Sequence, residues 1–251
     1  MTVQEFITAV QAGGTVSVDT DIDFNAYSFS ESVTIPTGTI INGNGHTLTN
    51  IQQGTSTYIF GFSGDITINN LNIRNLNLTT IHLFNGSAGV HVLNECQISG
   101  NCYRLYSSGQ SQFANSITYN RCSMHIGRYD NIRGTLNDCY VIVENNLTTS
   151  SAGNVALLGD RANNTYFKGN LKITGTITVS TSFSNCCINI DVDDSTYTIS
   201  LTYASDPVSV LNSDKMSNTN RNSHIVAVTD TEMHDAQSLF DVGFNIYVPS
   251  T

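Results

Sequence analysis

A short pattern of apolar and polar positions recurs along the chain. Each copy reads apolar residue, Asn, any residue, small apolar residue, any residue, apolar residue, and the clearest copies are residues 68–73, 93–98, 119–124 and 136–141. Alternating apolar positions are typical of a strand that buries one face. The Asn follows the first apolar position, where the chain has to bend. The pattern therefore predicts strands, each followed by a bend, that repeat along the chain.

The spacing of these copies predicts a solenoid. Successive copies are about 25, 26 and 17 residues apart, as expected when coils share strands but differ in loop length. The Ile, Val and Leu of the units favour buried parallel strands. We therefore expect an all-β fold, a single right-handed parallel β-solenoid over residues 16–211. Its predicted core includes Leu71, Ile73, Cys96, Ile98, Cys122, Met124, Cys139 and Val141.

The repeated Asn is expected to form the bend itself, because Asn tolerates the left-handed backbone region and bonds to nearby backbone groups. Stacked coils would bring these side chains together as a ladder of amides. The predicted members of the ladder are Asn69, Asn94, Asn120 and Asn137.

Three cysteines share one position of the repeat and should stack in the core: Cys96, Cys122 and Cys139. They can be interpreted as a metal or redox site, or as small buried hydrophobic residues. We favour the second interpretation because the chain has no Cys-x-x-Cys spacing. We expect no metal and no cofactor. The first residues lack the pattern of a signal peptide, so assembly in a reducing cytosol is expected.

A short amphipathic helix is predicted at residues 2–12, where it would close the first coil. Thr2 and Glu5 match a capping box, and Gly13 should end the helix. Its apolar face comprises Phe6, Ala9 and Val10. The expected organisation is a cap at residues 1–15, a solenoid at 16–211 and a C-terminal segment at 212–251.

A second helix is predicted near the C-terminus, at about residues 230–242, with Thr229 and Glu232 as another capping box. The candidate assembly residues in this helix and the following tail are Met233, Leu239, Phe240, Phe244 and Ile246. Two destinations remain open, a cap on the last coil of its own chain or a contact with another subunit or capsid protein. We favour the contact because the polar residues 212–223 resemble a tether.

The charge pattern limits the partners. Of the 251 residues only 12% are charged, and the formal net charge is −10 without any cluster of Lys or Arg. Binding to nucleic acid is therefore not expected. Acidic polysaccharides would be repelled unless a cation intervened. No apolar stretch approaches the roughly 18 residues of a membrane-spanning helix, so no membrane partner is expected.

The first coils resemble the start of pectate-lyase-like β-helix proteins. The residues that carry this resemblance are EFITAVQAGGTVSVDTDIDF at 5–24 and VTIPTGTIINGNGHTLTN at 33–50, including the turn INGNGHTL at 41–48. The resemblance implies a right-handed parallel β-helix over roughly residues 3–200. It does not imply one activity, because this superfamily includes lyases, hydrolases, tailspikes and non-catalytic virion proteins. The catalytic motifs of its pectate lyases and polygalacturonases find no match here.

The best candidate for catalysis is the acidic stretch Asp191, Asp193 and Asp194. If Ile190 points inward, Asp191 and Asp193 share the outer face of a strand, about 6.6 Å apart. That separation is close to the one between the carboxylates of inverting glycosidases, and it would also suit Ca²⁺. The alternative is a surface ion pair with Lys172, which we expect beside Asp191 on the preceding coil.

Five tyrosines fall in neighbouring coils: Tyr103, Tyr106, Tyr119, Tyr129 and Tyr140. They would form an outward strip for sugar stacking or protein contact, or they are partly buried structural residues. We favour the structural interpretation.

The stretch VTDTEMHDAQSLFDVGFNI at residues 228–246 resembles a C-terminal segment of virion proteins from tailed bacteriophages of gut bacteria. Our first hypothesis is a non-enzymatic structural protein of a phage particle: a head fibre, a capsid decoration or a tail-associated protein. It would be made in the bacterial cytoplasm and reside in the virion, with other virion proteins or further copies, such as a trimer, as partners. The alternative is a carbohydrate-binding or polysaccharide-degrading β-helix, such as a tailspike-like depolymerase. A bacterial adhesin is the third hypothesis.

Overall fold

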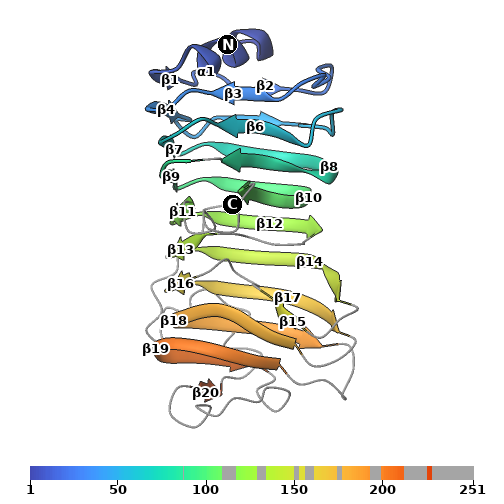
Figure 1. Cartoon of the computed structure of the whole chain (residues 1–251), viewed down its shortest axis with the longest axis vertical. Coiled ribbons are helices and arrows are strands. Elements are labelled where there is room, and N and C mark those ends of the chain that lie inside the picture. The colour runs from blue at the N-terminus through green and yellow to red at the C-terminus, as the bar shows by residue number, and fades with distance from the viewer. Residues whose placement is uncertain are drawn as a thin grey trace.

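The chain folds as a parallel β-solenoid, which confirms the predicted architecture (Figure 1). The computed structural model describes residues 1–86, 88–108, 117–128, 134–149, 153–155, 161–173, 177–192, 199–211 and 225–227. From Val143 onward, side chains are described only for residues 161–167 and Cys186. All strand pairs in these ranges are parallel, as expected when each coil adds its strands to those of the coil before.

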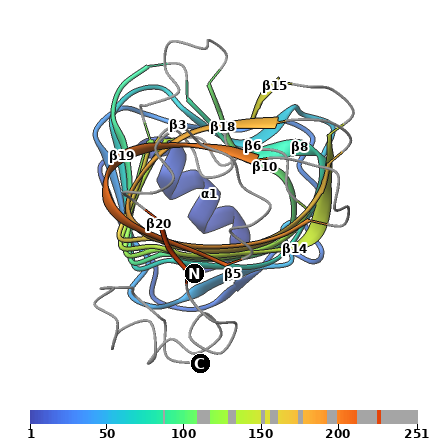
Figure 2. The same ribbon diagram turned by 90° about the horizontal axis from the view of Figure 1, so that it is seen from below.

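The strands line up in three columns along the long axis of the molecule (Figures 1 and 2). The first column contains β1 (Thr15–Ser17), β4 (Thr39–Asn42), β7 (Ile66–Asn69), β9 (His91–Asn94), β11 (Ile117–Asn120), β13 (Thr135–Asn137) and β16 (Arg161–Asn163). The second contains β2 (Ile22–Asp23), β5 (Thr47–Thr49), β12 (Ser123–Arg128), β14 (Tyr140–Thr149), β17 (Tyr166–Ile173) and β20 (Ile225–Ala227), with the first parts of β8 (Asn72–Gly86) and β10 (Gln97–Ser108).

The third column contains β3 (Val33–Ile35), β6 (Tyr58–Phe62), β15 (Gly153–Val155) and the last parts of β8 and β10. Two long strands, β18 (Ile177–Val192) and β19 (Ile199–Leu211), pass through all three columns. Seen along the long axis, the columns enclose the core as a ring (Figure 2).

The predicted core positions are confirmed. The eight side chains from Leu71 to Val141 that the repeat places inward are all at most 2% exposed. Between them the alternation of each strand sends every second side chain to the surface, as in the buried and half-buried pattern of β7, β9 and β11. The repeat therefore reflects burial on one face of each strand.

The amide ladder is confirmed and is longer than predicted. The side-chain Nδ2 of each Asn donates to Oδ1 of the equivalent Asn on the preceding coil, over 2.8–3.0 Å. Its members are Asn42, Asn69, Asn94, Asn120, Asn137 and Asn163. Each closes a strand of the first column, at the corner toward the second column.

The prediction that the ladder Asn itself takes the left-handed conformation is wrong. The residues with positive φ at these corners come one position later: Asn70, Glu95, Arg121, Asp138 and Asn164. The ladder Asn instead ends its strand, and its carbonyl accepts the backbone N–H of the corner residue on the preceding coil, as in Glu95 N to Asn120 O at 2.8 Å. This bond stabilises the left-handed corner even where the residue is Glu or Arg, which this region otherwise disfavours.

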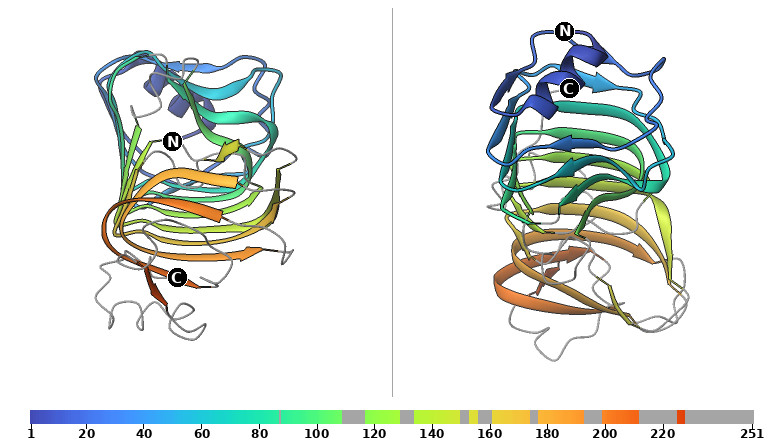
Figure 3. Two further views of the ribbon diagram at one scale, coloured as in Figure 1. Left: turned by 60° about the horizontal axis from the view of Figure 1, so that its bottom comes forward. Right: turned by 45° about the horizontal axis from the view of Figure 1, so that its top comes forward.

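The N-terminal helix is also confirmed. Helix α1 (Val3–Ala12) starts at the N-cap Thr2, which forms the complete capping box with Glu5, and it ends at Gly13 with φ 78°. Helix α1 lies across one end of the ring of strands (Figures 2 and 3). There its side chains of Phe6, Ile7 and Val10 are buried against the first coils. The helix thereby covers the apolar interior at this end.

The second predicted helix, at residues 230–242, lies outside the described residues, as do the tether at 212–223 and the tail. Within the part of the chain that the structure describes, α1 is the one α-helix.

Candidate functional site

The acidic stretch is placed only in part. Asp191 belongs to β18, but its side chain, Asp193 and Asp194 lie outside the described part of the structure. The backbone register puts Asn170 opposite Asp191 and Lys168 opposite Asn189. The expected position of Lys172 beside Asp191 is therefore wrong, because the coil from β17 to β18 is longer than the 17-residue coil on which that expectation rested.

The candidate assembly residues, Met233, Leu239, Phe240, Phe244 and Ile246, all lie outside the described residues. Their predicted role in contacts with another subunit or with a capsid protein stays a prediction.

The tyrosines whose side chains the structure describes do not form an outward strip. Tyr106 and Tyr119 are fully buried in the core. Tyr140 is partly exposed, and its ring stacks on that of Tyr166 with 4.8 Å between centroids and 14° between planes. The side chains of Tyr103 and Tyr129 lie outside the described residues. Where the rings are described, their role is structural packing.

The cysteines stack in the core as predicted. Cys96, Cys122 and Cys139 are at most 1% exposed, and each is a free thiol. Each thiol donates to the carbonyl of the ladder Asn two residues earlier, as in Cys139 Sγ to Asn137 O at 3.3 Å. The position also accepts Thr165, whose hydroxyl makes the same bond to Asn163 O at 2.9 Å. In these four coils a small side chain at this position therefore donates to the carbonyl at the corner, whereas Leu71 fills the same position with an apolar group.

The environment of two of these thiols, Cys96 and Cys122, keeps them protonated. The hydrogen bond with Cys122, followed by burial, raises the pKa of the Cys96 thiol well above its usual value. Burial raises the pKa of Cys122 in the same direction. A thiolate is the form that binds metals and attacks electrophiles. Across the described ranges, no group of three or more His, Cys, Asp or Glu side chains is placed to hold a metal ion.

Carboxylates on the solenoid surface tie successive coils together. Asp21 accepts the Thr47 backbone N–H at 2.9 Å, Asp23 accepts the Asn50 side-chain amide at 2.8 Å, and Asp138 accepts that of Asn164 at 3.0 Å. Further bonds of this kind join Asp65 to the backbone N–H of Val90 and Glu95 to Arg121. These acidic side chains therefore link neighbouring coils through hydrogen bonds.

Hydrogen bonding also lowers the pKa of two of these carboxyls, Asp21 and Asp23. The bond from Thr47 lowers the pKa of the Asp21 carboxyl, and the bond from Asn50 lowers that of Asp23. A general acid at neutral pH needs the opposite shift, a raised pKa. The two carboxyls are thus set up to stay ionised and to accept hydrogen bonds.

The outer surface of the first column forms a long uncharged face. Its outward side chains are the ladder asparagines from Asn42 to Asn137 and a second row in register with them: Thr15, Ile40, Thr67, Val92, Thr118 and Thr135. Ile40 is 39% exposed, and the rows are about 6.6 Å apart along each strand. Arg161 continues the second row and ends the uncharged stretch.

Sequence reasoning found the ladder row of this face but missed the β-branched row. The signal was available, because each member from Ile40 to Thr135 stands two residues before a ladder Asn and hence points to the same side of its strand. Interfaces between proteins are depleted in charged residues at their centre, so this uncharged face is the best-defined candidate contact surface among the described residues.

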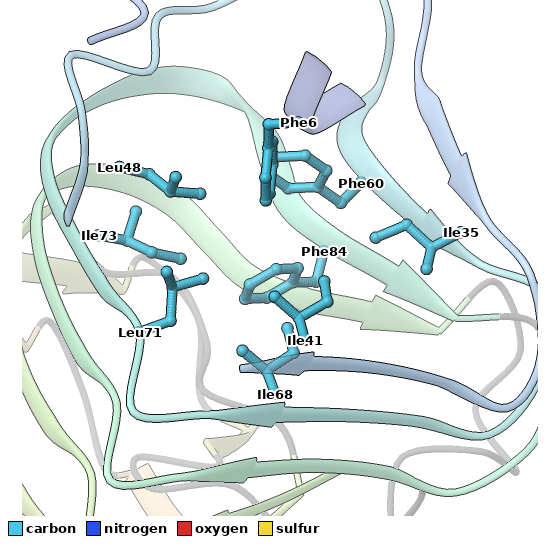
Figure 4. Close-up of a pocket in the computed structure, with 9 residues that line it drawn as sticks. All are labelled: Phe6, Ile35, Ile41, Leu48, Phe60, Ile68, Leu71, Ile73 and Phe84. Carbon is cyan, nitrogen blue, oxygen red and sulfur yellow. The ribbon is translucent and has the colours of Figure 1, made fainter. Parts of the chain in front are cut away.

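A small cavity lies in the core beneath α1 (Figure 4). Its lining is entirely apolar, with Phe6 from the helix and side chains from the first coils around it: Ile35, Ile41, Leu48, Phe60, Ile68, Leu71, Ile73 and Phe84. Apolar cavities of this kind stay dry. The cavity is a packing gap between helix and coils.

No helix in the described residues is long and apolar enough to cross a lipid bilayer. Comparison with known proteins finds no matching family model, no matching curated protein and no matching solved structure.

Proposed function

We propose that this chain is a non-enzymatic structural protein of a bacteriophage particle, such as a head fibre, a capsid decoration or a tail-associated protein. The observation that carries the proposal is the use of the polar side chains. Five of the described carboxylates and the amide ladder link one coil to the next, as in Asp21 to Thr47 and Asn120 to Asn94. A solenoid reinforced in this way suits a stiff spacer that has to keep its shape inside a larger assembly.

The uncharged face supports an assembly role. Two copies of a chain with a net charge of −10 repel one another over most surfaces, but this face brings no like charges together. We propose that it lies against another copy, for example in a trimer, or against another virion protein. The link to phage particles in particular rests on the resemblance of residues 228–246 to virion proteins.

The direct test is the composition of the particle. Particles of the encoding phage are purified by two successive density gradients and analysed by quantitative mass spectrometry. We expect the chain to co-purify with infectious particles at a fixed copy number relative to the major capsid protein. Loss of the chain from intact particles through the second gradient overturns the proposal.

A second experiment separates the two proposed contact elements. Deletion of residues 228–251 leaves β20 in place, and Thr118→Glu puts a charge at the centre of the uncharged face. The matched control is Ser99→Glu, a partly exposed position of the second column. We expect the deletion and Thr118→Glu to reduce self-association in sedimentation velocity or entry into particles, while circular dichroism stays unchanged. Equal behaviour of all three variants and the parent chain removes both elements from the proposal.

An enzymatic alternative is tested on the purified full chain. It is incubated with neutral and acidic polysaccharides, and reducing ends and unsaturated uronates are measured. We expect no turnover. Release that disappears in the double variant Asp191→Asn, Asp193→Asn would replace the structural proposal with a polysaccharide-degrading one.

A further inference from the structure

A histidine occupies a core position of the first column. His91 lies in register between Ile66 and Ile117, and it is fully buried. Its Nε2 lies 3.1 Å from the carbonyl oxygen of Ala88, and its Nδ1 lies 2.9 Å from the hydroxyl of Tyr106. Because a carbonyl only accepts, Nε2 carries the proton, and Nδ1 accepts from the Tyr106 O–H. The geometry thus fixes a neutral imidazole in one tautomer.

The surroundings leave this ring no room to move. The rings of Phe62 and Tyr106 lie 4.9 and 5.5 Å from it between centroids. Gly86 closes another side, where a Cβ would come within 2.2 Å of His91 Cε1 and 2.3 Å of the Tyr106 oxygen. A protonated His91 therefore cannot turn toward water without displacing its neighbours.

His91 also holds the turn that precedes it. The imidazole binds the carbonyl of Ala88, while Asp65 Oδ1 accepts the Val90 N–H at 2.7 Å. Gly89, with φ 91°, lies against the preceding coil, where a Cβ would be 2.5 Å from the carbonyl carbon of Gly64. Val90 stands at the surface of this turn with 60% of its area exposed. The side chains of His91 and Asp65 thus hold residues 88–90 in place through hydrogen bonds.

We propose that His91 is an acid-sensitive latch, whose protonation releases residues 88–90 and opens the solenoid at β9. The protonated ring carries two N–H donors, so Nδ1 no longer accepts from Tyr106, and the Tyr106 hydroxyl has to reorient. The added charge lies in a buried interior, where burial disfavours the charged ring more than the neighbouring carbonyls and Asp65 favour it. Release of the turn relieves both conditions by bringing the ring to water.

The other groups that face His91 do not remove this penalty. From β10 comes the Tyr106 hydroxyl. From the turn before β7 come the Gly64 carbonyl and the Asp65 carboxylate, and the Val90 N–H already engages this carboxylate. The residues that β6, β8 and β11 bring to this site are Phe62, Gly86 and Ile117, none of which titrates.

The direction of the pH dependence follows from the burial. Burial lowers the pKa of His91 below its ordinary value of 6.5. In the unfolded or opened chain the group titrates near that ordinary value. The stability it supports is therefore complete above about pH 6.5 and falls as the pH drops below that value, toward the lower pKa of the folded state.

The test is urea unfolding of the full chain from pH 7.5 to 5.0, followed by circular dichroism, for the parent, His91→Gln and His125→Gln. His91→Gln keeps a polar side chain without titration, and His125 is an exposed histidine on β12 that serves as control. We expect the unfolding constant of the parent and of the control to rise by up to about tenfold per pH unit below pH 6.5 relative to His91→Gln. Equal pH profiles for parent and His91→Gln overturn the proposal.

A second measurement needs no variant. Nitrogen-15 NMR of the histidine rings reports protonation and tautomer directly in the folded parent chain. We expect His91 to remain neutral with its proton on Nε2 at pH 6, and the protection of the Val90 amide against hydrogen exchange to fall by pH 5.5. Ordinary titration of His91 near pH 6.5 in a folded chain, or unchanged protection of Val90, also overturns the proposal.

Discussion

The side-chain amide of Asn120 donates to Oδ1 of Asn94 over 2.9 Å, while Asn94 donates in turn to Asn69 over 2.8 Å. Each interior member of the ladder thus accepts one hydrogen bond and donates another. Since these amides are half-buried, removing one leaves a donor and an acceptor on different coils without partners.

We therefore expect Asn94→Ala to lower the free energy of unfolding by about 1–3 kcal/mol. Asn163→Ala is the control, since Asn163 ends the described ladder with a bond to Asn137, and it should cost less. Urea unfolding monitored by circular dichroism measures both. A smaller effect at Asn94 than at Asn163 would show that the ladder contributes little to stability.

The stacked cysteines give a prediction for the core. Cys122→Asp should cost several kcal/mol, because a charge would enter a dry interior beside Cys96 and Cys139. Cys122→Ala should cost only about 1–2 kcal/mol, for a small cavity and one lost thiol donor. Thermal unfolding compares the two. Similar losses would mean that the position is wetter or more adaptable than its burial indicates.

The raised pKa values of Cys96 and Cys122 predict slow thiol chemistry in the folded chain. Labelling of the folded chain with a maleimide at pH 8 should leave both cysteines unmodified. Labelling at a urea concentration that unfolds the chain should modify both. Mass spectrometry of peptides reports each site. Rapid labelling of Cys122 without urea would contradict the placement of this residue in a protected core.

Two buried tyrosines should respond in opposite ways to loss of their hydroxyl. The Tyr119 oxygen has no hydrogen-bond partner within the described structure, whereas the Tyr106 oxygen binds His91. Tyr119→Phe should therefore be neutral or stabilise the chain by up to about 1 kcal/mol, and Tyr106→Phe should destabilise it by about 1–3 kcal/mol. Urea unfolding at pH 7.5 checks both, and a matching sign for the two changes would refute this assignment.

The N-terminal helix gives two predictions about stability, one of a small loss and one of a larger loss. Thr2→Ala removes the N-cap acceptor for the Glu5 N–H and should cost about 1 kcal/mol. Phe6→Ala removes the contacts of this ring with Phe24 and Phe60 and should lower the free energy of unfolding by about 3–5 kcal/mol. Gln4→Ala, at an exposed position of the same helix, is the control. Thermal unfolding ranks the three variants, and the expected order is Phe6, Thr2, Gln4.

The repeated unit was sufficient to predict the fold because it encodes burial directly. A residue such as Cys96 or Met124 is apolar at a fixed distance from a ladder Asn, and the stacking of coils follows from that regularity. The corner was misplaced by one residue because two adjacent positions are polar there. The pattern cannot distinguish the Asn that ends the strand from the residue that turns it, such as Glu95.

The candidate sites were harder to predict because they depend on contacts between coils of unequal length. The register that places Asn170, and not Lys172, beside Asp191 follows from the length of one coil, which the spacing of other coils does not supply. His91 was missed for a different reason. A polar residue at a core position breaks the apolar rule, and its partner Tyr106 lies on the coil that follows.

Helix α1 closes one end of the solenoid, and within the described residues each coil is bonded only to its immediate neighbours. These two features give the molecule a mechanical direction. A pulling force applied across the described solenoid would release its coils one after another, starting from the end away from α1. A coil such as the one from Asn94 to Asn120 spans 26 residues, so each event would release about 90 Å of extended chain. Under tension the molecule would lengthen in coil-sized steps and lose its N-terminal coils last.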